Sequence, residues 1–387
     1  MTQAESKPVA DEDRQRLDTI FERTIEHFLE PVGDFLHDPS VTEIMINGPR
    51  EVFIEQRGRL LLTNARFESE EALQAAVRNI LQFSGKRLTD ERPLMDGRLP
   101  DGSRFHVATR PCSRRGTVVT IRKFSRQAFD MDYLIQCGTL SEMTRDFLIL
   151  CVVTEKNLLV SGGTSSGKTS LLNVLSEYIA EDRRIVVIEE SGELQLRQPH
   201  VIGLEARPPD RYGRGEVTIR ELFKNSLRMR PDRVIVGECR GGEALDMIQA
   251  MTSGHAGSMT TLHADSPGDA LNRLETMAMM SNVDIPLSAL RAQIASGIHV
   301  IVQMMRFGDG SRRVVQVSQV LGLSERGDYR VEDLFTLKLP PGETSLAKAR
   351  LEWTGRQLVF RHEVAVQVET RKFPSLQGLV ADNGQKG

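Results

Sequence analysis

The nine residues from Gly162 to Ser170 read GGTSSGKTS and combine three glycines, one lysine and five hydroxyl side chains. Gly162, four further residues, then Gly167, Lys168 and Thr169 have the spacing of a phosphate-binding loop, whose backbone N–H groups wrap a phosphate. In such a loop Lys168 reaches the β and γ phosphates of a nucleotide, and the Thr169 hydroxyl holds Mg²⁺. The candidate cofactor-binding residues are therefore Gly162, Gly163, Thr164, Ser165, Ser166, Gly167, Lys168, Thr169 and Ser170.

The flanks of this loop agree with that interpretation. The apolar run NLLV, residues 157–160, precedes the loop as a short buried strand would, and LLNVLSEYIA follows it with helical apolar spacing. A strand, a glycine loop and a helix in this order favour nucleotide binding over the alternative, a flexible glycine turn.

A second segment, RMRPDRVIVGECR, has an apolar strand that ends in Gly237 and Glu238. This resembles a Walker B strand, whose carboxylate holds Mg²⁺ or orients the attacking water in phosphoryl transfer. Glu238 is accordingly a candidate catalytic residue and, with Thr169, a candidate metal ligand. The alternative is an acid that simply faces solvent at a strand end.

A third segment, IEESGEL, places Glu189, Glu190 and Glu193 at the end of another expected strand. Like charges raise one another's pKa unless a cation compensates them, so one of these acids is a candidate base for water. The alternative is a solvated acidic loop.

Two histidines bracket the segment HAGSMTTLH, His255 and His263. Their eight-residue gap is not a zinc-ligand spacing on one helix face, and no third ligand is near in the sequence. His263, at a strand end, could donate to a γ phosphate, whereas His255 is expected to lock a turn. The alternative is that both histidines are structural.

The strands that carry these residues alternate with helices along residues 131–323, which predicts a parallel-rich α/β domain that binds its ligand at the strand ends. Before it, residues 16–130 mix helix with antiparallel strand patterns and predict a smaller α+β domain, with a boundary near Asp130. Residues 1–15 are expected to be disordered. Residues 324–387 form a C-terminal extension in which LEWTGRQLVFRH predicts a hairpin at Thr354 and Gly355.

Composition narrows the class of protein. The net charge of -3 gives no overall basic field for nucleic acid, and the four cysteines, at 112, 137, 151 and 239, form no CxxC pair. The longest apolar run, FLILCVV, is far shorter than the roughly 20 residues that span a bilayer, and the polar start lacks a signal core. These features predict a soluble, cytoplasmic protein without a transmembrane segment.

Taken together, the motifs resemble those of the secretion ATPases that drive type II secretion, type IV pili and type IV secretion. The resemblance covers about residues 31–322 and is strongest to the CpaF/TadA branch, which serves tight-adherence (Flp) pilus assembly. It rests on GGTSSGKTS, IEESGELQLRQPHVIGLEARPP, LRMRPDRVIVGECRGGEALDMIQAMTSGHAGSMTTLHADSP and QIASGIHVIVQ, together with the N-terminal VTEIMINGP and DGRLPDGSRFHVA.

This resemblance implies a hexameric ring ATPase that uses ATP and Mg²⁺. It implies a RecA-like C-terminal domain and a position at the inner face of the inner membrane, where the ring works a platform protein. Glu193 matches the catalytic glutamate of the acidic box, Glu238 the Walker B glutamate, and His255 and His263 the histidine box. N-terminal arginines serve as fingers in this family, and the matching stretch contains Arg98, Arg104, Arg110 and Arg122, of which Arg104 and Arg110 are taken as catalytic candidates.

Ser165 departs from the family pattern, because it stands where a second loop glycine is usual. Serine adopts a positive φ less readily than glycine. Two other functions remain open: a conjugation or DNA-transfer ATPase of the same superfamily, and a nucleotide-dependent scaffold. The complete set of acids argues against the scaffold, and the mixed charge of the N-terminal domain does not favour DNA.

Overall fold

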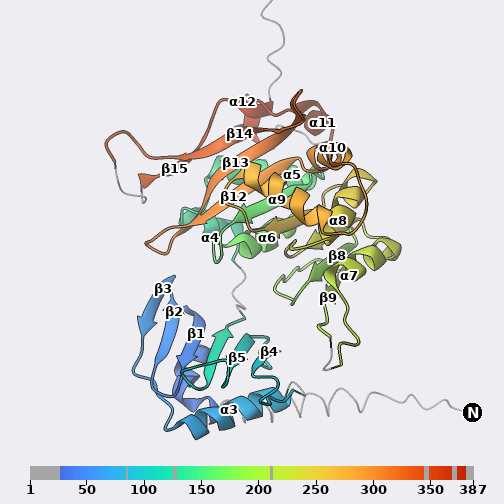
Figure 1. Ribbon diagram of the computed structural model, residues 1–387. Helices are drawn as coiled ribbons and strands as arrows, with labels where there is room; N and C mark the ends of the chain where they lie inside the picture. The colour runs from blue at the N-terminus through green and yellow to red at the C-terminus, as the bar shows by residue number, and fades with distance from the viewer. Residues whose placement is uncertain are drawn as a thin grey trace, which may run out of the picture. The chain divides into compact units, whose positions relative to one another are not determined.

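The computed structural model describes residues 27–83, 86–124, 129–209, 212–343, 348–367 and 373–380 (Figure 1). The disordered N-terminus expected over residues 1–15 lies outside these residues. The chain divides into two compact units, Met1–Gln127 and Ala128–Gly387. Each unit has a hydrophobic core of its own.

The first unit is built on an antiparallel sheet with the strand order β3-β2-β1-β6-β5-β4. Alternate residues of its central strands, such as Ile44 and Ile46, share a core with Leu73 and Val77 of α3, which therefore covers one face (Figure 1). The side chains in between lie on the opposite face. The elements are η1 (Glu30–Val32), α2 (Gly33–His37), β1 (Val41–Asn47), β2 (Val52–Gln56), β3 (Arg59–Leu62), α3 (Glu70–Phe83), β4 (Leu94–Arg98), β5 (Arg104–Ala108) and β6 (Val118–Arg122).

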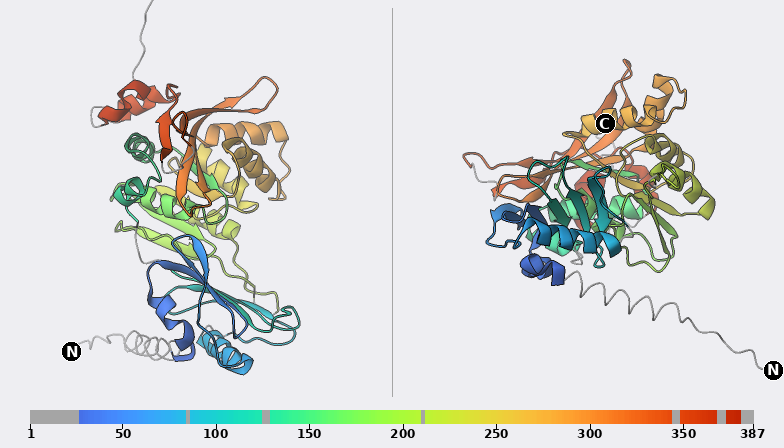
Figure 2. Two further views of the ribbon diagram at one scale, coloured as in Figure 1. Left: turned by 90° about the vertical axis from the view of Figure 1, so that its left-hand side faces the viewer. Right: turned by 60° about the horizontal axis from the view of Figure 1, so that its bottom comes forward.

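The second unit contains a sheet with the order β15-β14-β13-β12-β7-β11-β10-β8-β9. From β12 to β9 neighbouring strands are parallel, whereas β13, β14 and β15 add antiparallel pairs at one side (Figure 2). This confirms the expected fold class. The strands are β7 (Leu158–Gly162), β8 (Ile185–Glu189), β9 (Val201–Glu205), β10 (Arg233–Val236), β11 (Met259–Leu262), β12 (Val300–Arg306), β13 (Arg312–Leu323), β14 (Tyr329–Lys338) and β15 (Arg350–Trp353).

Helices pack on both faces of this sheet. Leu158 and Val160 of β7 belong to one core cluster and Leu159 to the other, because successive side chains of a strand point to opposite faces. The first cluster includes α5 and α6, and the second includes α8, α9 and α10. The helices are α4 (Met131–Gln136), α5 (Glu142–Val153), α6 (Lys168–Ser176), α7 (Ile219–Ser226), η2 (Leu227–Met229), α8 (Glu243–Thr252), α9 (Pro267–Met279), α10 (Leu287–Gly297), α11 (Arg361–Gln367), η5 (Pro374–Leu376) and α12 (Gln377–Val380).

The hairpin expected around Thr354 and Gly355 is wrong. The strand β15 ends at Trp353, whose indole Nε1 donates to the carbonyl of Arg356, and α11 follows a few residues later. Leu358 and Phe360 are apolar because they are buried in the core from a non-strand segment. The strand β9 was also not expected, because its residues are only partly buried and carry a weak apolar pattern.

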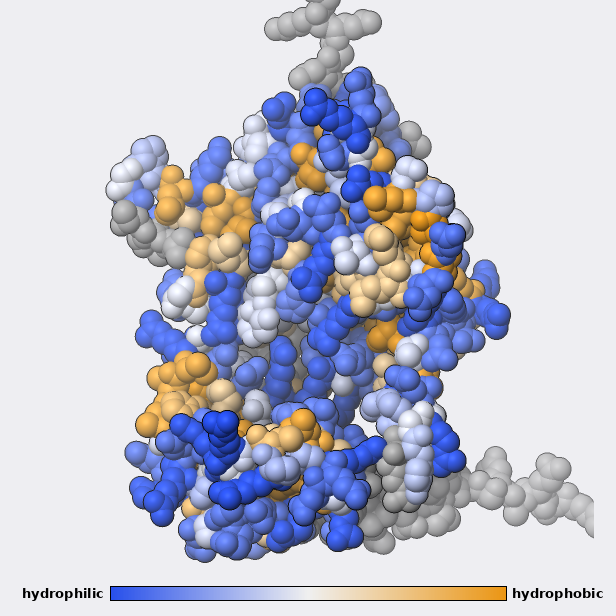
Figure 3. Space-filling model, viewed as in Figure 1, coloured by the Kyte–Doolittle hydropathy of each residue, from blue (hydrophilic) through white to orange (hydrophobic). Residues whose placement is uncertain are grey.

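Two groups of apolar side chains are exposed at the surface (Figure 3). Leu60, Leu61 and Leu62 lie on the edge strand β3, and Met279 and Met280 lie at the end of α9. Within the described parts of the chain, no helix is both long and apolar enough to cross a bilayer.

Candidate active site

The glycine loop connects β7 to α6, and several of its residues have positive φ angles, as in a loop that wraps around a phosphate. Gly162 has φ 153°, Gly167 has φ 96°, and a Cβ on Gly162 would lie 2.3 Å from the carbonyl oxygen of Met304 on β12. Both positions therefore require glycine. Ser165, between them, has φ 56°, a left-handed conformation that is costly for serine. The residue that departs from the family pattern thus adopts the glycine-like backbone.

Lys168 is buried at the first position of α6, with 6% of its surface exposed. Its ammonium donates to the carbonyls of Gly162 at 3.0 Å and Gly163 at 2.9 Å. Thr169 and Ser170, both half-buried, follow in the first turn of α6, while Gly163 and Thr164 are exposed. A helix N-terminus with unpaired N–H groups and an adjacent lysine is suited to an anionic phosphate.

Three further strand ends lie beside the loop, because β7, β11, β10 and β8 are successive parallel neighbours. His263 follows β11, Glu238 follows β10, and Glu189 ends β8. Carboxyl ends of neighbouring parallel strands meet at one edge of the sheet. The structure therefore brings the glycine loop, His263, Glu238 and Glu189 to the same edge of the sheet, although they belong to four separate sequence motifs.

His263 connects the loop to the acid after β10. Its Nδ1 lies 3.4 Å from the Lys168 ammonium, and its Nε2 lies 3.2 Å from Oε1 of Glu238. Partial burial and the Lys168 charge lower the pKa of His263, against the opposing effect of Glu238. A neutral ring with its proton on Nε2 satisfies both contacts, since Nδ1 then accepts from lysine and Nε2 donates to the carboxylate.

Glu238 is held in the ionised form by cations. Burial acts to raise its pKa, but the hydrogen bonds and charge of Arg240, with His263 and Lys168, outweigh burial and lower the pKa. Arg240 binds both carboxylate oxygens, with Nε 2.7 Å from Oε1 and Nη2 3.0 Å from Oε2. A carboxylate so held is available as an oxygen ligand or an acceptor from water.

Arg240 is a further residue at this sheet edge, and it was not among the candidates predicted from the sequence. Besides Glu238, it contacts Oε2 of Glu190 through Nη1 at 2.5 Å and so joins the ends of β10 and β8. Its backbone N–H and that of Gly241 donate to buried Glu243, which fixes the loop. The signal was present in GECRGGE, where an arginine follows the acid by two residues and a second acid follows by five.

Glu189 is the buried member of the acidic segment. Burial raises its pKa to about 7, although its Oε1 accepts backbone N–H bonds from Glu193 and Leu194. A Cβ on Gly237 would lie 2.9 Å from Cγ of Glu189, so that glycine leaves room for the acid. Glu189 therefore holds the loop that carries Glu193, and Glu193 itself is half-buried.

His255 does not join this group. It lies in the turn before β11, whereas His263 lies after that strand. Its backbone N–H donates to the Ala250 carbonyl, and its own carbonyl accepts from the Ser258 hydroxyl. These bonds involve only the backbone of His255, and its Nδ1 is buried without a hydrogen-bond partner in the described part of the chain.

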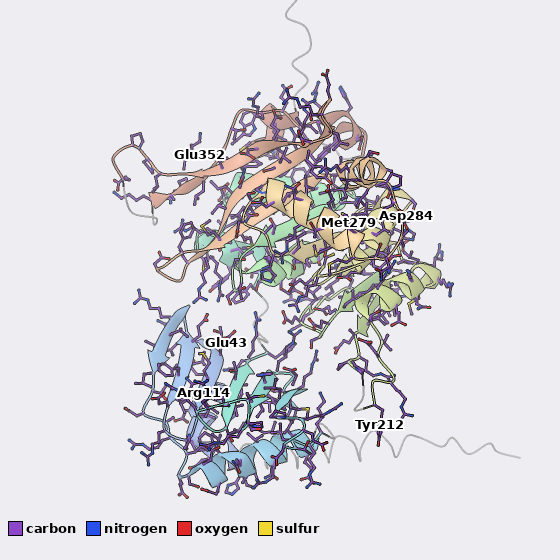
Figure 4. All side chains as sticks on the ribbon, viewed as in Figure 1. Glu43, Arg114, Tyr212, Met279, Asp284 and Glu352 are labelled. Carbon is purple, nitrogen blue, oxygen red and sulfur yellow. The ribbon has the colours of Figure 1, made fainter. Side chains whose placement is uncertain are left out.

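In the first unit, three of the four candidate arginines lie in one row across neighbouring strands. Arg98 on β4 pairs with Arg104 on β5, and Arg104 pairs with Arg122 on β6. Glu43 of β1, labelled in Figure 4, ends the row as the register partner of Arg122, at 3.9 Å from its Nε. Arg110 is exposed and lies beyond β5, outside the row.

This row lies on the sheet face that α3 does not cover, since its residues alternate with the core residues Phe105 and Ile121. Like charges directly opposite on a sheet are unfavourable. Arg98, Arg104 and Arg122 therefore lie side by side at one level of the sheet, and Glu43 lies beside Arg122.

The oxygen donors expected for Mg²⁺ fit that ion, because a threonine hydroxyl and a carboxylate are hard ligands. Thr169 lies in the first turn of α6, and Glu238 follows β10, which β11 separates from β7. In the described ranges, no cluster of three or more histidine, cysteine or acidic side chains could hold a metal by itself.

Comparison with known proteins identifies similar chains. The family described as type II/IV secretion system protein matches residues 26–330. A putative conjugal transfer protein of Mycobacterium tuberculosis is 32% identical over 75% of this chain and 83% of its own length. The type IV secretion system protein PtlH of Bordetella pertussis is 34% identical over 76% of this chain and 94% of its own length.

A solved structure is similar in fold alone. The ATPase DotB of Yersinia pseudotuberculosis superposes with a TM-score of 0.54, at 16% identity, over 80% of each chain.

Proposed function

This chain belongs to the family of type II/IV secretion system proteins, and from that premise we propose that it is an Mg²⁺-dependent ATPase. We propose further that it acts as a hexameric ring motor of the CpaF/TadA branch, at the inner face of the inner membrane. There it would drive tight-adherence pilus assembly or secretion through membrane platform proteins.

One observation carries the ATPase proposal: the contacts from Lys168 through His263 to Glu238. They place a phosphate-binding lysine, a histidine and an ionised acid within hydrogen-bond distances of one another, from three separate strands. A scaffold that only binds nucleotide needs the lysine but not the acid. The assembled group instead matches the needs of phosphoryl transfer, in which charge is neutralised and water is oriented.

Each group then has a chemical task. The loop N–H groups bind the phosphates, and Lys168 exchanges its two loop carbonyls for β and γ phosphate oxygens. Thr169 and Glu238 would hold Mg²⁺, which would neutralise charge on the phosphates. In this structure the Nε2–H of His263 donates to Glu238, and we propose that it turns to a γ phosphate oxygen when nucleotide binds, which would release that oxygen of Glu238.

Glu193 is the acid proposed to orient the attacking water. It is half-buried on a loop whose backbone is fixed by the carboxyl of Glu189. A rigid loop keeps such a base at a constant distance from the phosphate, which general base catalysis requires.

The arginines of the first unit are proposed to complete the charge stabilisation. Arg104 is the middle residue of the row, and Arg98 and Arg122 flank it. Guanidinium groups stabilise the negative charge that develops on the transferred phosphoryl group. Arg110, outside the row, is the weaker candidate.

Ring assembly rests on the family resemblance, and the exposed leucines of β3 support it. A short edge strand with Leu60, Leu61 and Leu62 exposed is unusual on an isolated chain, because such patches are normally covered by a partner. A neighbouring subunit would cover it.

The second candidate function is a conjugation or type IV secretion ATPase that serves DNA or protein transfer. It is favoured by the relatives, whose names are those of conjugal transfer and type IV secretion proteins. Deletion of the gene in its host separates the two: loss of surface pili supports pilus assembly, and loss of plasmid transfer with pili intact supports conjugation.

The ATPase itself is tested with Lys168→Ala in the full-length chain. We expect Mg²⁺-dependent phosphate release from the natural protein and none from this variant, because the ammonium that binds the β and γ phosphates is gone. Lys338→Ala, an exposed lysine at the end of β14, is the matched control and retains turnover. Substantial turnover by Lys168→Ala, with an unchanged circular dichroism spectrum, would contradict the assignment.

A further inference from the structure

Ser165 has an intrinsic cost in the loop conformation. At φ 56° it is a non-glycine residue in the left-handed region. An L-residue populates this region about 5 to 30 times less than the right-handed helical region. Such a backbone persists only where its surroundings hold it. A specific partner of Ser165 is therefore to be expected.

Arg312, the first residue of β13, provides that contact. Its Nε donates to the carbonyl oxygen of Ser165 at 3.0 Å, across 147 positions of sequence. The same side chain lies along the loop, because a Cβ placed on Gly167 would be 3.4 Å from Cδ of Arg312. The arginine thus contacts both the strained residue and the residue before Lys168.

Arg312 is itself fixed by the turn between β12 and β13. Asp309 accepts from the N–H of Ser311 at 2.9 Å and from its hydroxyl at 2.6 Å, and Gly310 has φ 86°. The loop is also bounded by β12, whose Met304 carbonyl blocks any side chain on Gly162. The phosphate-binding loop therefore packs against the hairpin of β12 and β13.

We propose that Arg312 is a positioning residue for nucleotide binding, which holds Ser165 in the left-handed conformation that the phosphate cradle requires. This rests on the proposed ATP binding at the loop. Arg312 acts through the backbone carbonyl of Ser165. Its hydrogen bond offsets the conformational cost that serine has in the left-handed region and that glycine would not have.

The test is a double-mutant cycle in the full-length protein, with ATP and Mg²⁺ as the probe and calorimetric titration as the measurement. Arg312→Met keeps the aliphatic stem against Gly167 and removes the donor, so the Kd for ATP should rise about five- to tenfold. In the Ser165→Gly background the same change should raise Kd about twofold or less, because glycine needs no anchor. Turnover at saturating ATP should change less than KM.

Arg330→Met, at an exposed arginine of β14, is the matched control for the lost charge and leaves the Kd unchanged. The inference is overturned if Arg312→Met binds ATP as the natural protein does. It is equally overturned if the loss is the same size in both backgrounds, because Arg312 would then act on the nucleotide or the fold and not through Ser165. Failure of the natural protein to bind ATP would instead refute the proposed function.

Discussion

The imidazole Nε2 of His263 lies 3.2 Å from Oε1 of Glu238, and this pair links the acid after β10 to the lysine of the phosphate-binding loop. The neutral ring can hold both neighbours only with one nitrogen as donor and the other as acceptor. We propose that a phosphate that takes the Lys168 ammonium away from Nδ1 of His263 also alters the contact of His263 with Glu238.

Glu238→Gln should bind ATP but hydrolyse it on the order of 10² times more slowly or worse. The amide keeps the shape and loses the charge that attracts Mg²⁺ and accepts from water. Single-turnover hydrolysis at several Mg²⁺ concentrations is the measurement, and we expect this variant to need more Mg²⁺. Loss of ATP affinity altogether would show a structural role for the acid.

Glu193→Gln should also bind ATP and turn over slowly, since a missing general base costs about 10² to 10⁴ in rate. In contrast to Glu238→Gln, its Mg²⁺ requirement should equal that of the natural protein. Equal turnover in Glu193→Gln and the natural protein would transfer the base role to another acid, and Glu189 would be the next to examine.

The free energy of unfolding of the natural protein should depend on pH through Glu189, and Glu189→Gln should remove that dependence. The pKa of Glu189 is raised from its ordinary 4.5 to about 7 by burial, so its stabilising contribution is complete below about pH 4.5 and lost as pH rises through about 7. Between pH 5 and pH 8 the natural protein should lose about 2–3 kcal/mol at this residue.

Thermal unfolding of the two proteins at pH 5 and pH 8 checks this expectation. The midpoint of the natural protein should fall relative to that of Glu189→Gln as pH rises. Parallel midpoints at both pH values would mean that Glu189 titrates as an ordinary carboxyl.

Arg104→Ala should reduce turnover by on the order of 10³ while ATP still binds, because it removes the central guanidinium of the row. Arg110→Ala, outside the row, should have a smaller effect. If Arg104→Ala is fully active, Arg104 is not the arginine that stabilises the transferred phosphoryl group.

Mixing Arg104→Ala with Lys168→Ala shows which subunit the arginine serves. If it acts across a subunit interface of the ring, about one interface in four at equal mixing pairs an intact loop with an intact arginine, and activity returns. An arginine that serves its own subunit restores nothing in the mixture.

The sequence predicted the parallel-rich sheet because its strands, such as residues 158–160 and 185–188, are buried on both faces and are therefore continuously apolar. It also predicted that the loop, Glu238 and His263 share one sheet edge, since residues after parallel strands must do so. Local patterns of this kind are readable from a single chain.

Contacts between distant segments were not predictable. The bonds of Arg240 to Glu190 and of Arg312 to Ser165 depend on which strands become neighbours and on side-chain conformations at their ends. The same holds for the arginine row, because its members became neighbours only through the register of β4, β5 and β6. The false hairpin arose from apolar loop residues that fill the core, which mimic a strand pattern.

The strand order has a consequence for synthesis of the chain. The strand β7 is paired with β11 and β12, which are translated about 100 and 140 residues later, and the anchor of its loop at Arg312 emerges later still. Until residues 259–312 have been translated, the glycine loop lacks one or more of its two neighbouring strands and the contact of Arg312. The loop therefore reaches the arrangement seen in the folded chain only after Arg312 has been translated.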